Sequence, residues 1–517
     1  MAEIADKSLH KIAKGTGIVL FGTIVGMFLG FGGRIMLARL FSTSDYGIYS
    51  LALVIFNIVA VVSTLGFQQG TTRQIAYYRG KGESRKTQVV VTSSLQIVII
   101  ASLSLSTFLF ITSDIISVNI FHEPELSPTI KIFSIAVPFF SLINIFVSIF
   151  AGFDQVKPRV YFQNILRNGL FPLLLIPVIL IGLSFTVAIY AFTTSIIITS
   201  VALILYTTKK YSNLFSGVGQ FTINLEVKKL LLFSLPLLLI SMLNMIIGWT
   251  DTLMLGLLIT ATDVGLYNAA LPLSQLIGVI FSSLGFIYVP IVSQLFSKEL
   301  LQEIRSNYQV ITKWIFFATL PFFLTILLFP KIILDLFFGP QYVEANTALQ
   351  FLSVAVLIHI FLGPNGLTLL AMGKSRPLIF ASLLAMILNI FLNFFLIPVW
   401  GILGAAIATT LSNVAANVFN SIALFRIYKI HPFSNQYLRP IVLSILPIIL
   451  VCWATNNFLT INCWILLMFI IFFSIVITVS ILLTKSVGYE DISLITTISK
   501  QFGKSFTSFK HIFKYFK

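Results

Sequence analysis

Apolar runs of roughly 20 residues recur along the whole chain, and a run of that length crosses about 30 Å of hydrocarbon as a helix. We count fourteen such spans in the 517 residues, with approximate limits 16–38, 46–68, 88–112, 132–152, 160–182, 184–206, 230–256, 265–290, 314–338, 347–371, 377–397, 402–425, 440–460 and 462–484. Hydrophobic residues make up 57% of the chain and charged residues only 10%, which excludes a water-soluble fold. Membrane barrels need segments of about ten residues that alternate in polarity, and these are absent. The sequence therefore predicts an all-α polytopic membrane protein.

The positive charges follow the order of these spans. If the N-terminus is placed in the cytoplasm, 29 of the 33 Lys and Arg residues fall on the cytoplasmic side, and the exceptions are Arg34, Arg39, Lys131 and Lys331. Basic residues accumulate in cytoplasmic loops of membrane proteins. We therefore expect a multi-pass protein of the cytoplasmic membrane with both termini in the cytoplasm, and we interpret the net charge of +16 as an orientation signal rather than nucleic-acid binding.

One stretch of the chain occurs twice. Residues 34–49 read RIMLARLFSTSDYGIY from the end of the first span, and residues 250–267 read TDTLMLGLLITATDVGLY. An offset of 218 residues aligns three motif positions, pairing Asp45, Gly47 and Tyr49 with Asp263, Gly265 and Tyr267. Further matches between residues 65–177 and 284–398 keep nearly the same offset. The sequence therefore predicts a duplicated unit of six spans.

An even number of spans makes both copies enter the membrane from the same side, so we expect parallel lobes and not inverted repeats. The predicted organisation is an N-lobe at 1–206, a cytoplasmic linker at 207–229, a C-lobe at 230–430, a transmembrane hairpin at 431–484 and a basic amphipathic cytoplasmic tail at 485–517. Aromatic and aliphatic residues of the tail recur every three or four positions between lysines, which predicts a helix lying on an anionic inner leaflet.

Ionisable residues inside spans are costly unless they face a cavity or a partner, so each is a candidate functional residue. Arg34 lies in the outer third of the first span, where it lines a cavity or extends its side chain to the outer surface. Asp251 lies at the corresponding depth of the seventh span, and we expect it to face a cavity, where an ion pair with Arg34 across the lobe interface is a natural arrangement. Arg167 lies in the inner half of the fifth span, as a cavity residue or an inner anchor.

Several uncharged or weakly basic residues also lie within spans. Asparagines recur at helical spacing, which fits either hydrogen bonds between helices or a polar passage for sugar hydroxyls, and they are Asn389, Asn393, Asn413, Asn417 and Asn420. A lone histidine in the tenth span, His359, is more typical of a hydrogen bond to a neighbouring helix than of a proton carrier. Gly363 and Pro364 interrupt the same span and predict a kink or hinge.

Motifs for other chemistry are weak. The HEPE run at 122–125 holds two carboxylates and one histidine in a predicted outer loop, and a solvated loop explains it better than a metal site. No GxxxxGK[ST] motif is present, which disfavours transport driven by ATP binding to this chain. Cys452 and Cys463 lack metal-ligand spacing and are interpreted as small apolar residues. We predict no resident cofactor or metal, and coupling to H⁺ or Na⁺ stays open.

The chain resembles the polysaccharide transporter branch of the multidrug/oligosaccharidyl-lipid/polysaccharide exporter superfamily. The resemblance is carried by ARLFSTSDYGIYSLAL after the first span, DTLMLGLLITATDVGLYNAA in and after the seventh and GILGAAIATTLSN at the start of the twelfth. By pattern the chain is similar to O-antigen (Wzx-type) flippases and to the lipid II flippase. The resemblance implies a V-shaped pair of lobes around a cavity and export of polyprenyl-linked oligosaccharide to the outer leaflet.

A flippase of this kind needs cations for a lipid phosphate or pyrophosphate and polar groups for the sugar. The candidates for the phosphate are Arg34 and Arg167, with Arg73 gathering substrate at the cytoplasmic mouth, and Asn413 and Asn417 contacting the glycan. Expected partners are the lipid-linked oligosaccharide, membrane lipids and glycosyltransferases or a polymerase. Two alternatives remain: a cation-coupled drug and toxin exporter of the same superfamily, and a non-transporting scaffold of a glycan-synthesis complex.

Overall fold

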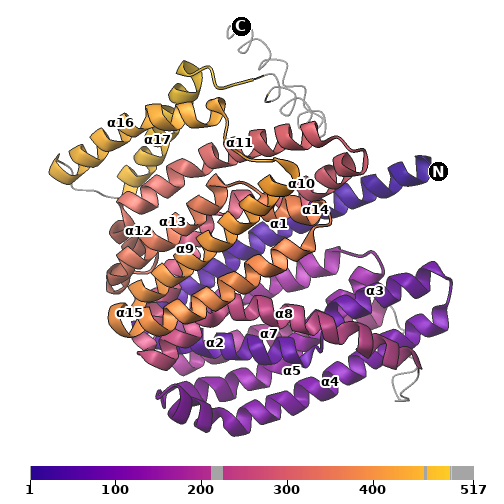
Figure 1. Ribbon diagram of the computed structural model, residues 1–517. Helices are drawn as coiled ribbons and strands as arrows, with labels where there is room; N and C mark the ends of the chain where they lie inside the picture. The colour runs from indigo at the N-terminus through magenta and orange to yellow at the C-terminus, as the bar shows by residue number, and fades with distance from the viewer. Residues whose placement is uncertain (1, 211–224, 459–462, 489–490, 492–517) are drawn as a thin grey trace. The chain divides into compact units, whose positions relative to one another are not determined.

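The computed structural model describes residues 2–210, 225–458, 463–488 and 491, and every regular element in these ranges is helical (Figure 1). The first elements are α1 (Ala2–Leu40), α2 (Thr43–Ser63), α3 (Phe67–Gly80), α4 (Ser84–Asp114), η1 (Ile115–Ile120), α5 (Leu126–Gly152), η2 (Arg159–Leu166), α6 (Arg167–Ile181) and α7 (Phe185–Lys210). After the linker come α8 (Leu225–Leu258), α9 (Ala261–Ile277), α10 (Val279–Ser297), α11 (Leu301–Leu328), α12 (Pro330–Phe337), η4 (Pro340–Ala345), α13 (Asn346–Phe361), α14 (Asn365–Ala371), α15 (Ser375–Tyr428), α16 (Asn435–Phe458) and α17 (Cys463–Leu483).

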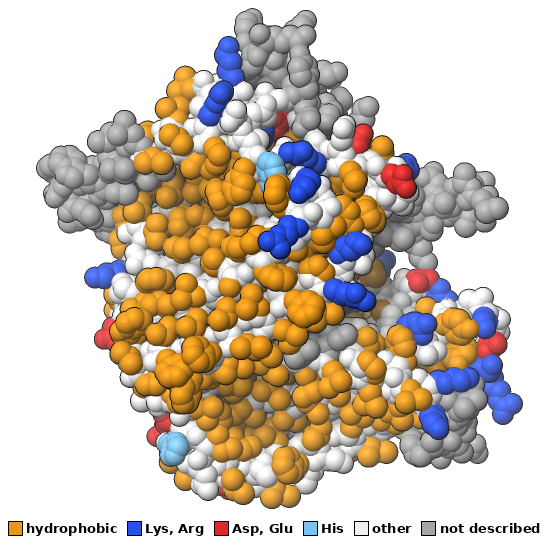
Figure 2. Space-filling model, in the orientation of Figure 1, with side chains coloured by type: hydrophobic (Ala, Val, Ile, Leu, Met, Phe, Trp, Pro, Cys, Tyr) orange, Lys and Arg blue, Asp and Glu red, His pale blue; other side chains and the backbone are white. Residues whose placement is uncertain are grey.

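The prediction of an all-α membrane protein is confirmed. Within the described residues, ten helical stretches are long and apolar enough to cross a membrane. The longest of these, α15, contains both the predicted eleventh span and the predicted twelfth span. Three further predicted spans also correspond to helices: 230–256 to α8, 265–290 to α9 and α10, and 440–460 to α16. On the face drawn in Figure 2, hydrophobic side chains cover most of the surface and Lys and Arg gather toward its upper and right margins.

Glycines with positive φ break or bend the helices at three positions. Gly66 (φ 73°) separates α2 from α3, so the basic segment after the second span begins as a helix and not as a loop. Gly401 (φ 55°) bends α15 at the predicted short outer turn, and Gly363 (φ 78°) separates α13 from α14 at the predicted interruption. Positive φ values of this kind favour glycine because it has no Cβ.

The two copies of the repeated motif start their helices in the same way. The Asp45 amide donates to the Ser42 hydroxyl (3.1 Å) at the start of α2, and the Asp263 amide donates to the Thr260 hydroxyl (3.3 Å) at the start of α9. Each aspartate also accepts a hydrogen bond from the same hydroxyl residue, which satisfies the exposed polar groups of the helix end. Residues that the offset of 218 pairs in the sequence therefore also form the same hydrogen bonds at the starts of their helices.

The chain forms two compact units, each with its own packed helices. The first comprises Met1–Ala269 with Ile397–Ile402, and the second comprises Ala270–Leu396 with Leu403–Lys517. In the first unit, α5 packs against α2, α3, α4 and α7, and α8 packs along α2 and α3. In the second unit, α11 packs against α13 and α17, and α16 packs against α17. The predicted amphipathic tail helix, residues 492–517, lies outside the described residues.

Candidate functional site

Close packing between α1 and the fifth span positions the candidate cations of the first unit. Gly22 and Gly26 of α1 face η2 so closely that a Cβ on either would collide with Val160 or with the Asn164 backbone. Two amide side chains from the fifth span fix the contact: Asn164 donates to the Thr23 hydroxyl (3.1 Å) and Asn168 donates to the Gly26 carbonyl oxygen (3.1 Å). Small residues allow membrane helices to approach in this way.

Arg167 follows a π-helical segment, because η2 ends at Leu166 and the Arg167 amide donates to the Phe162 carbonyl oxygen. Its guanidinium donates from Nε and Nη2 to the Asn168 side-chain oxygen (3.3 and 3.2 Å) and lies 5.3 Å from the ring centre of Phe140. The amide and the aromatic ring therefore fix the direction of the side chain. Short π-helical segments inside helices are frequent at functional sites.

A cavity of about 250 Å³ lies beside these two helices, and both candidate arginines line it. Its other lining residues are polar or aromatic for the most part, and all belong to the first unit: Gly30, Tyr49, Leu53, Phe56, Asn57, Phe140, Asn168, Phe171, Phe192, Ser195 and Ile196. No carboxylate is among them. Tyr49 lines the cavity together with both Arg34 and Arg167 and interacts electrostatically with each of them.

Aromatic rings form the rigid wall of this arginine cavity. The Tyr49 ring stacks on Phe171 with ring centres 6.2 Å apart, and its other neighbour Phe192 contacts it edge to face at 5.7 Å. Phe56 contacts Phe140 edge to face at 5.2 Å. Paired aromatic side chains stabilise one another beyond the area they bury, so the positions of the arginines are set by packed elements.

The predicted ion pair between Arg34 and Asp251 is wrong for this structure. Asp251 is buried, with 7% of its surface exposed, and its Oδ2 accepts a hydrogen bond of 2.7 Å from the Tyr267 hydroxyl. In the part of the chain that the structure describes, Arg34 makes no ion pair with it; the guanidinium lines the arginine cavity instead. Asp251 is absent from that lining because its side chain is directed to the motif tyrosine of the second copy.

Arg73 is exposed on α3, where its guanidinium lies 4.4 Å from the ring centre of Phe233 on α8. It does not line the arginine cavity. This placement keeps the charge at the helix surface, as a residue that gathers anionic substrate requires.

The asparagines of the second unit make hydrogen bonds between helices. His359 Nδ1 lies 2.5 Å from the Asn417 side-chain oxygen, and Asn365 donates to the Asn417 carbonyl oxygen (3.1 Å) and to Ser421 (2.8 Å). Asn417 in turn donates to the Asn413 carbonyl oxygen (2.8 Å). Of the two readings that the sequence left open, these contacts favour helix-to-helix hydrogen bonding.

Asn389 donates to Thr409 (3.2 Å), which lies on the other side of the Gly401 bend in α15, and Asn393 donates to Asn389 within one segment of that helix (3.1 Å). In the HEPE run, Glu123 accepts a hydrogen bond of 2.9 Å from the Ala261 amide and so caps α9. In the described ranges no group of three His, Cys, Asp or Glu side chains is arranged to hold a metal ion.

Sequence reasoning did not select Tyr49, Asn57 or Ser195 as site residues, although all three line the arginine cavity. Asn57 could have been selected from the sequence as a candidate site residue, because it is an isolated amide in an otherwise apolar span. Ser195 carried none, since serines are frequent in membrane helices that contain no site.

A family model described as a polysaccharide biosynthesis protein matches residues 12–296, more than half of the chain, and a MatE model matches residues 236–395. The probable low-salt glycan biosynthesis flippase Agl15 of Haloferax volcanii is 28% identical over 177 residues, which cover 34% of this chain and 37% of that protein. The chain thus spans little more than a third of that relative's length. The putative O-antigen transporter of Shigella flexneri is 22% identical over 398 residues, 75% of this chain and 92% of that protein.

Two solved structures share the fold. The lipid II flippase MurJ in an inward closed conformation superposes with a TM-score of 0.69 at 14% identity, covering 92% of this chain and 99% of that one. An inward-facing MATE-family multidrug transporter of the MOP superfamily superposes with a TM-score of 0.64 at 16% identity, covering 79% and 97%. The two relatives and the two structures are transporters and flippases by name, in agreement with the prediction that the chain is a transporter and not an enzyme.

Proposed function

Because the chain belongs to the polysaccharide biosynthesis protein family of membrane transporters, we propose that it is a flippase for polyprenyl-linked oligosaccharide. It moves this lipid from the cytoplasmic leaflet to the outer leaflet of the cytoplasmic membrane during surface polysaccharide or glycan assembly. The names of the Haloferax and Shigella relatives support this substrate class, since one is a glycan biosynthesis flippase and the other an O-antigen transporter.

The observation that carries the proposal is the arginine cavity, which presents two guanidinium groups and no carboxylate. A lipid phosphate or pyrophosphate is the part of such a substrate that hydrocarbon rejects most strongly. Guanidinium groups bind phosphate oxygens through paired, charge-assisted hydrogen bonds. Arg34 and Arg167 therefore take the phosphate in our proposal, and Asn57, Asn168 and Ser195 offer neutral hydrogen bonds to the same head group.

The remaining predicted residues take supporting roles. Arg73, exposed on α3, gathers the anionic head group at the cytoplasmic mouth, and Asn413, which is exposed, contacts sugar hydroxyls. Alternating access of the two repeated lobes carries the substrate across, with Gly363 and Pro364 as a hinge. The left-handed backbone at Gly363 and the helix ends on either side of it support that assignment.

Asp251 is the proposed coupling residue. A buried carboxylate that accepts a hydrogen bond from Tyr267 can bind H⁺ or Na⁺ when its surroundings change during the cycle. Coupling at Asp251 and phosphate binding at Arg34 and Arg167 then occur at separate positions of the fold.

Flipping in reconstituted vesicles tests the proposal. The substrate is a polyprenyl-diphosphate oligosaccharide with a radiolabelled sugar, and its arrival in the opposite leaflet is followed by sensitivity to an added glycosidase. We expect Arg34→Ala and Arg167→Ala each to lower the rate by at least about tenfold, since a hydrogen-bonded charge contributes about 1.5–3 kcal/mol. Arg159→Ala is the matched control, because Arg159 is exposed on η2 eight residues before Arg167. Normal flipping by both cavity variants at normal abundance would remove the arginine cavity from the mechanism.

One observation favours a second candidate. The MatE model matches residues 236–395, which contain Asp251, and drug exporters of this fold couple transport to cations. In that case vesicles would accumulate an amphipathic organic cation and not flip the glycolipid. The arginine cavity argues against this, because its charge repels cationic drugs. A non-transporting scaffold would show neither activity.

A further inference from the structure

The chain folds back on itself after α17. α17 ends at Leu483, and Lys485 adopts a left-handed backbone (φ 49°) that turns the chain. The turn is closed by the Ser486 amide, which donates to the Ile481 carbonyl oxygen (3.1 Å), and by a 2.7 Å contact between the hydroxyls of Thr484 and Ser486. We call Lys485–Gly488 together with Asp491 the C-terminal strap.

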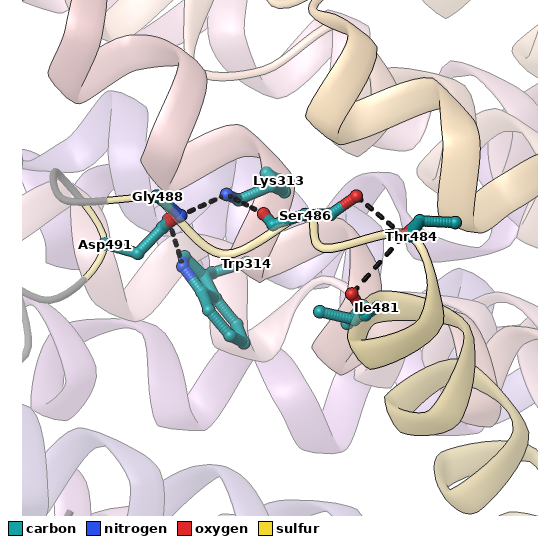
Figure 3. A network of polar contacts seen from close by, with 7 residues as sticks. All are labelled: Lys313, Trp314, Ile481, Thr484, Ser486, Gly488 and Asp491. Atoms are coloured by element: carbon teal, nitrogen blue, oxygen red, sulfur yellow. Dashed lines mark hydrogen bonds and ion pairs between the residues drawn. The ribbon is translucent and has the colours of Figure 1, made fainter. Parts of the chain in front are cut away.

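The strap is fastened to α11 through one carboxylate, as Figure 3 shows. Asp491 Oδ2 accepts from Lys313 Nζ (2.7 Å) and from the Gly488 amide (2.6 Å), and its Oδ1 accepts from Trp314 Nε1 (2.8 Å). Lys313 Nζ also donates to the Ser486 carbonyl oxygen (2.9 Å). Both charged side chains are buried, with 5% of Lys313 and 1% of Asp491 exposed.

This burial makes the two residues depend on each other. A buried ammonium or carboxylate is strongly unfavourable without a partner, whereas a pair with its remaining hydrogen bonds satisfied is tolerated. Lys313 lies on a helix whose neighbouring residues are largely apolar, so it holds its charge there only while the strap supplies Asp491. The strap therefore supplies the negative charge that pairs with Lys313 of α11.

The strap adds an ionic attachment to the packing of α17 against α11. Near the start of α17, Phe469 stacks on Phe329, which follows the end of α11, with ring centres 4.7 Å apart. Beyond the end of α17, Asp491 pairs with Lys313. One attachment is apolar and the other is ionic, and both lie along the second half of α11, from Lys313 to Phe329.

The other helix of the C-terminal pair meets α11 within four residues of Lys313. Tyr437 of α16 contacts the rings of Phe316 and Phe317, with centres 5.4 and 6.1 Å apart. Between α11, the first turn of α16 and the strap lies a polar cavity of about 430 Å³, lined by Gln309, Val310, Lys313, Ser434, Asn435, Gln436 and Gly488. Gly488 forms the strap's side of this cavity.

From these contacts we propose that the C-terminal strap is a conformational device in which the pair Lys313–Asp491 fixes the end of α17 to α11. With the pair formed, α16 and α17 move with α11 as one body, and the polar cavity stays closed on the side of the strap. Loss of either charge frees the strap and exposes that cavity while the helices stay folded. The device lies outside the arginine cavity and does not depend on the transported substrate.

Thiol accessibility in the full-length protein in nanodiscs tests the proposal. Both native cysteines are replaced by alanine, and Val487→Cys in the strap reports its release by reaction with a polar maleimide. We expect Lys313→Met and Asp491→Asn each to raise the labelling rate by more than about tenfold, because each leaves an unpaired buried group. Lys298→Met is the matched control, since Lys298 is an exposed lysine just before α11, and it should leave the rate unchanged.

Two further variants separate strap release from other effects. The double variant Lys313→Met/Asp491→Asn leaves no unpaired charge, so it should label more slowly than the product of the two single effects predicts. Leu352→Cys, buried in α13, reports the integrity of the second unit and should stay unlabelled throughout. Unchanged labelling at Val487→Cys in both single variants, multiplicative effects in the double variant, or simultaneous labelling of Leu352→Cys would each overturn the proposal.

Discussion

At the scale of single residues, the two copies of the repeated motif hold charges of opposite sign beside equivalent tyrosines. Tyr49 of the first copy lies beside Arg34, and Tyr267 of the second copy donates to Asp251. Offset by 218 residues, the two tyrosines occupy the same place in their helices. Both copies of the motif therefore have a tyrosine at the equivalent position, with a cation beside it in the first copy and an anion beside it in the second.

The hydrogen bond from Tyr267 to Asp251 should contribute more to stability than one between neutral groups. Tyr267→Phe should lower the free energy of unfolding by about 1.5–3 kcal/mol, because a buried carboxylate loses a donor. Tyr288→Phe is the matched control: Tyr288 is also buried, and its hydroxyl lies 2.8 Å from the neutral Thr368 hydroxyl, so a loss of about 0.5–1.5 kcal/mol is expected. Thermal unfolding in detergent measures both, and equal losses would contradict the charge-assisted bond.

Which charged residues face a cavity was easier to predict than which residues pair with one another. The cost of charge in hydrocarbon singled out Arg34 and Arg167, and the structure brings them to one cavity. The partner of Asp251 was not predictable, since depth in the membrane does not specify which side chain of a neighbouring helix is within reach. The pair Lys313–Asp491 could not be predicted from the sequence either. The two residues are 178 positions apart, and Lys313 lies just outside the predicted span 314–338, where a lysine is typical of a cytoplasmic loop.

At the scale of helices, the repeated motif creates a close crossing. A Cβ on Gly47 of α2 would collide with the Ala261 carbonyl oxygen, and a Cβ on Gly265 of α9 would collide with the Thr43 carbonyl oxygen. The starts of α2 and α9 therefore touch through their backbones, glycine against glycine. Helix packing with small residues at the contact is typical of membrane proteins, and here it explains why the motif keeps glycine in both copies.

This crossing gives a prediction with an internal control. Gly47→Ala should destabilise the protein by about 1–3 kcal/mol, since the obstacle is backbone and cannot rotate away. Gly32→Ala, in α1, adds a methyl group with no atom within 4 Å and should be neutral or stabilise by up to about 1 kcal/mol through helix propensity. Thermal unfolding and membrane abundance measure the difference. A Gly47→Ala variant as stable as Gly32→Ala would show that α2 and α9 do not pack this closely.

Helices were more predictable than their irregularities. Hydrophobic length and turn residues located the spans, including the two joined in α15 and the interruption at Gly363. The π-helical geometry of η2, which precedes Arg167, has no counterpart in the hydropathy pattern. η2 packs against the glycine face of α1, and a contact between such distant segments is not visible in the hydropathy pattern. The predicted second span ends at residue 68, and its continuation as the helix α3 was not predicted because basic residues like those that follow are typical of a loop.

At the scale of the whole molecule, the prediction of parallel repeats can be tested by topology. Each predicted repeat has six spans, so equivalent loops of the two copies must lie on the same side of the membrane; inverted repeats would place them on opposite sides. The bias of Lys and Arg further assigns the segments around Ser84 and Ser375 to the cytoplasm and those around Ser184 and Glu344 to the outside. All four residues are exposed.

Single cysteines at these four positions, in a chain whose Cys452 and Cys463 are replaced by alanine, should therefore divide into two pairs. In intact cells a membrane-impermeant maleimide should label Ser184→Cys and Glu344→Cys, and in inverted vesicles it should label Ser84→Cys and Ser375→Cys. Thiol access follows from which loops the aqueous phase reaches, so the result is independent of transport activity. Labelling of Ser375→Cys from outside together with Ser84→Cys from inside would indicate an inverted second copy. In that case Arg34 and Asp251 would lie at opposite depths, and a pathway through equivalent halves of the repeat could not operate.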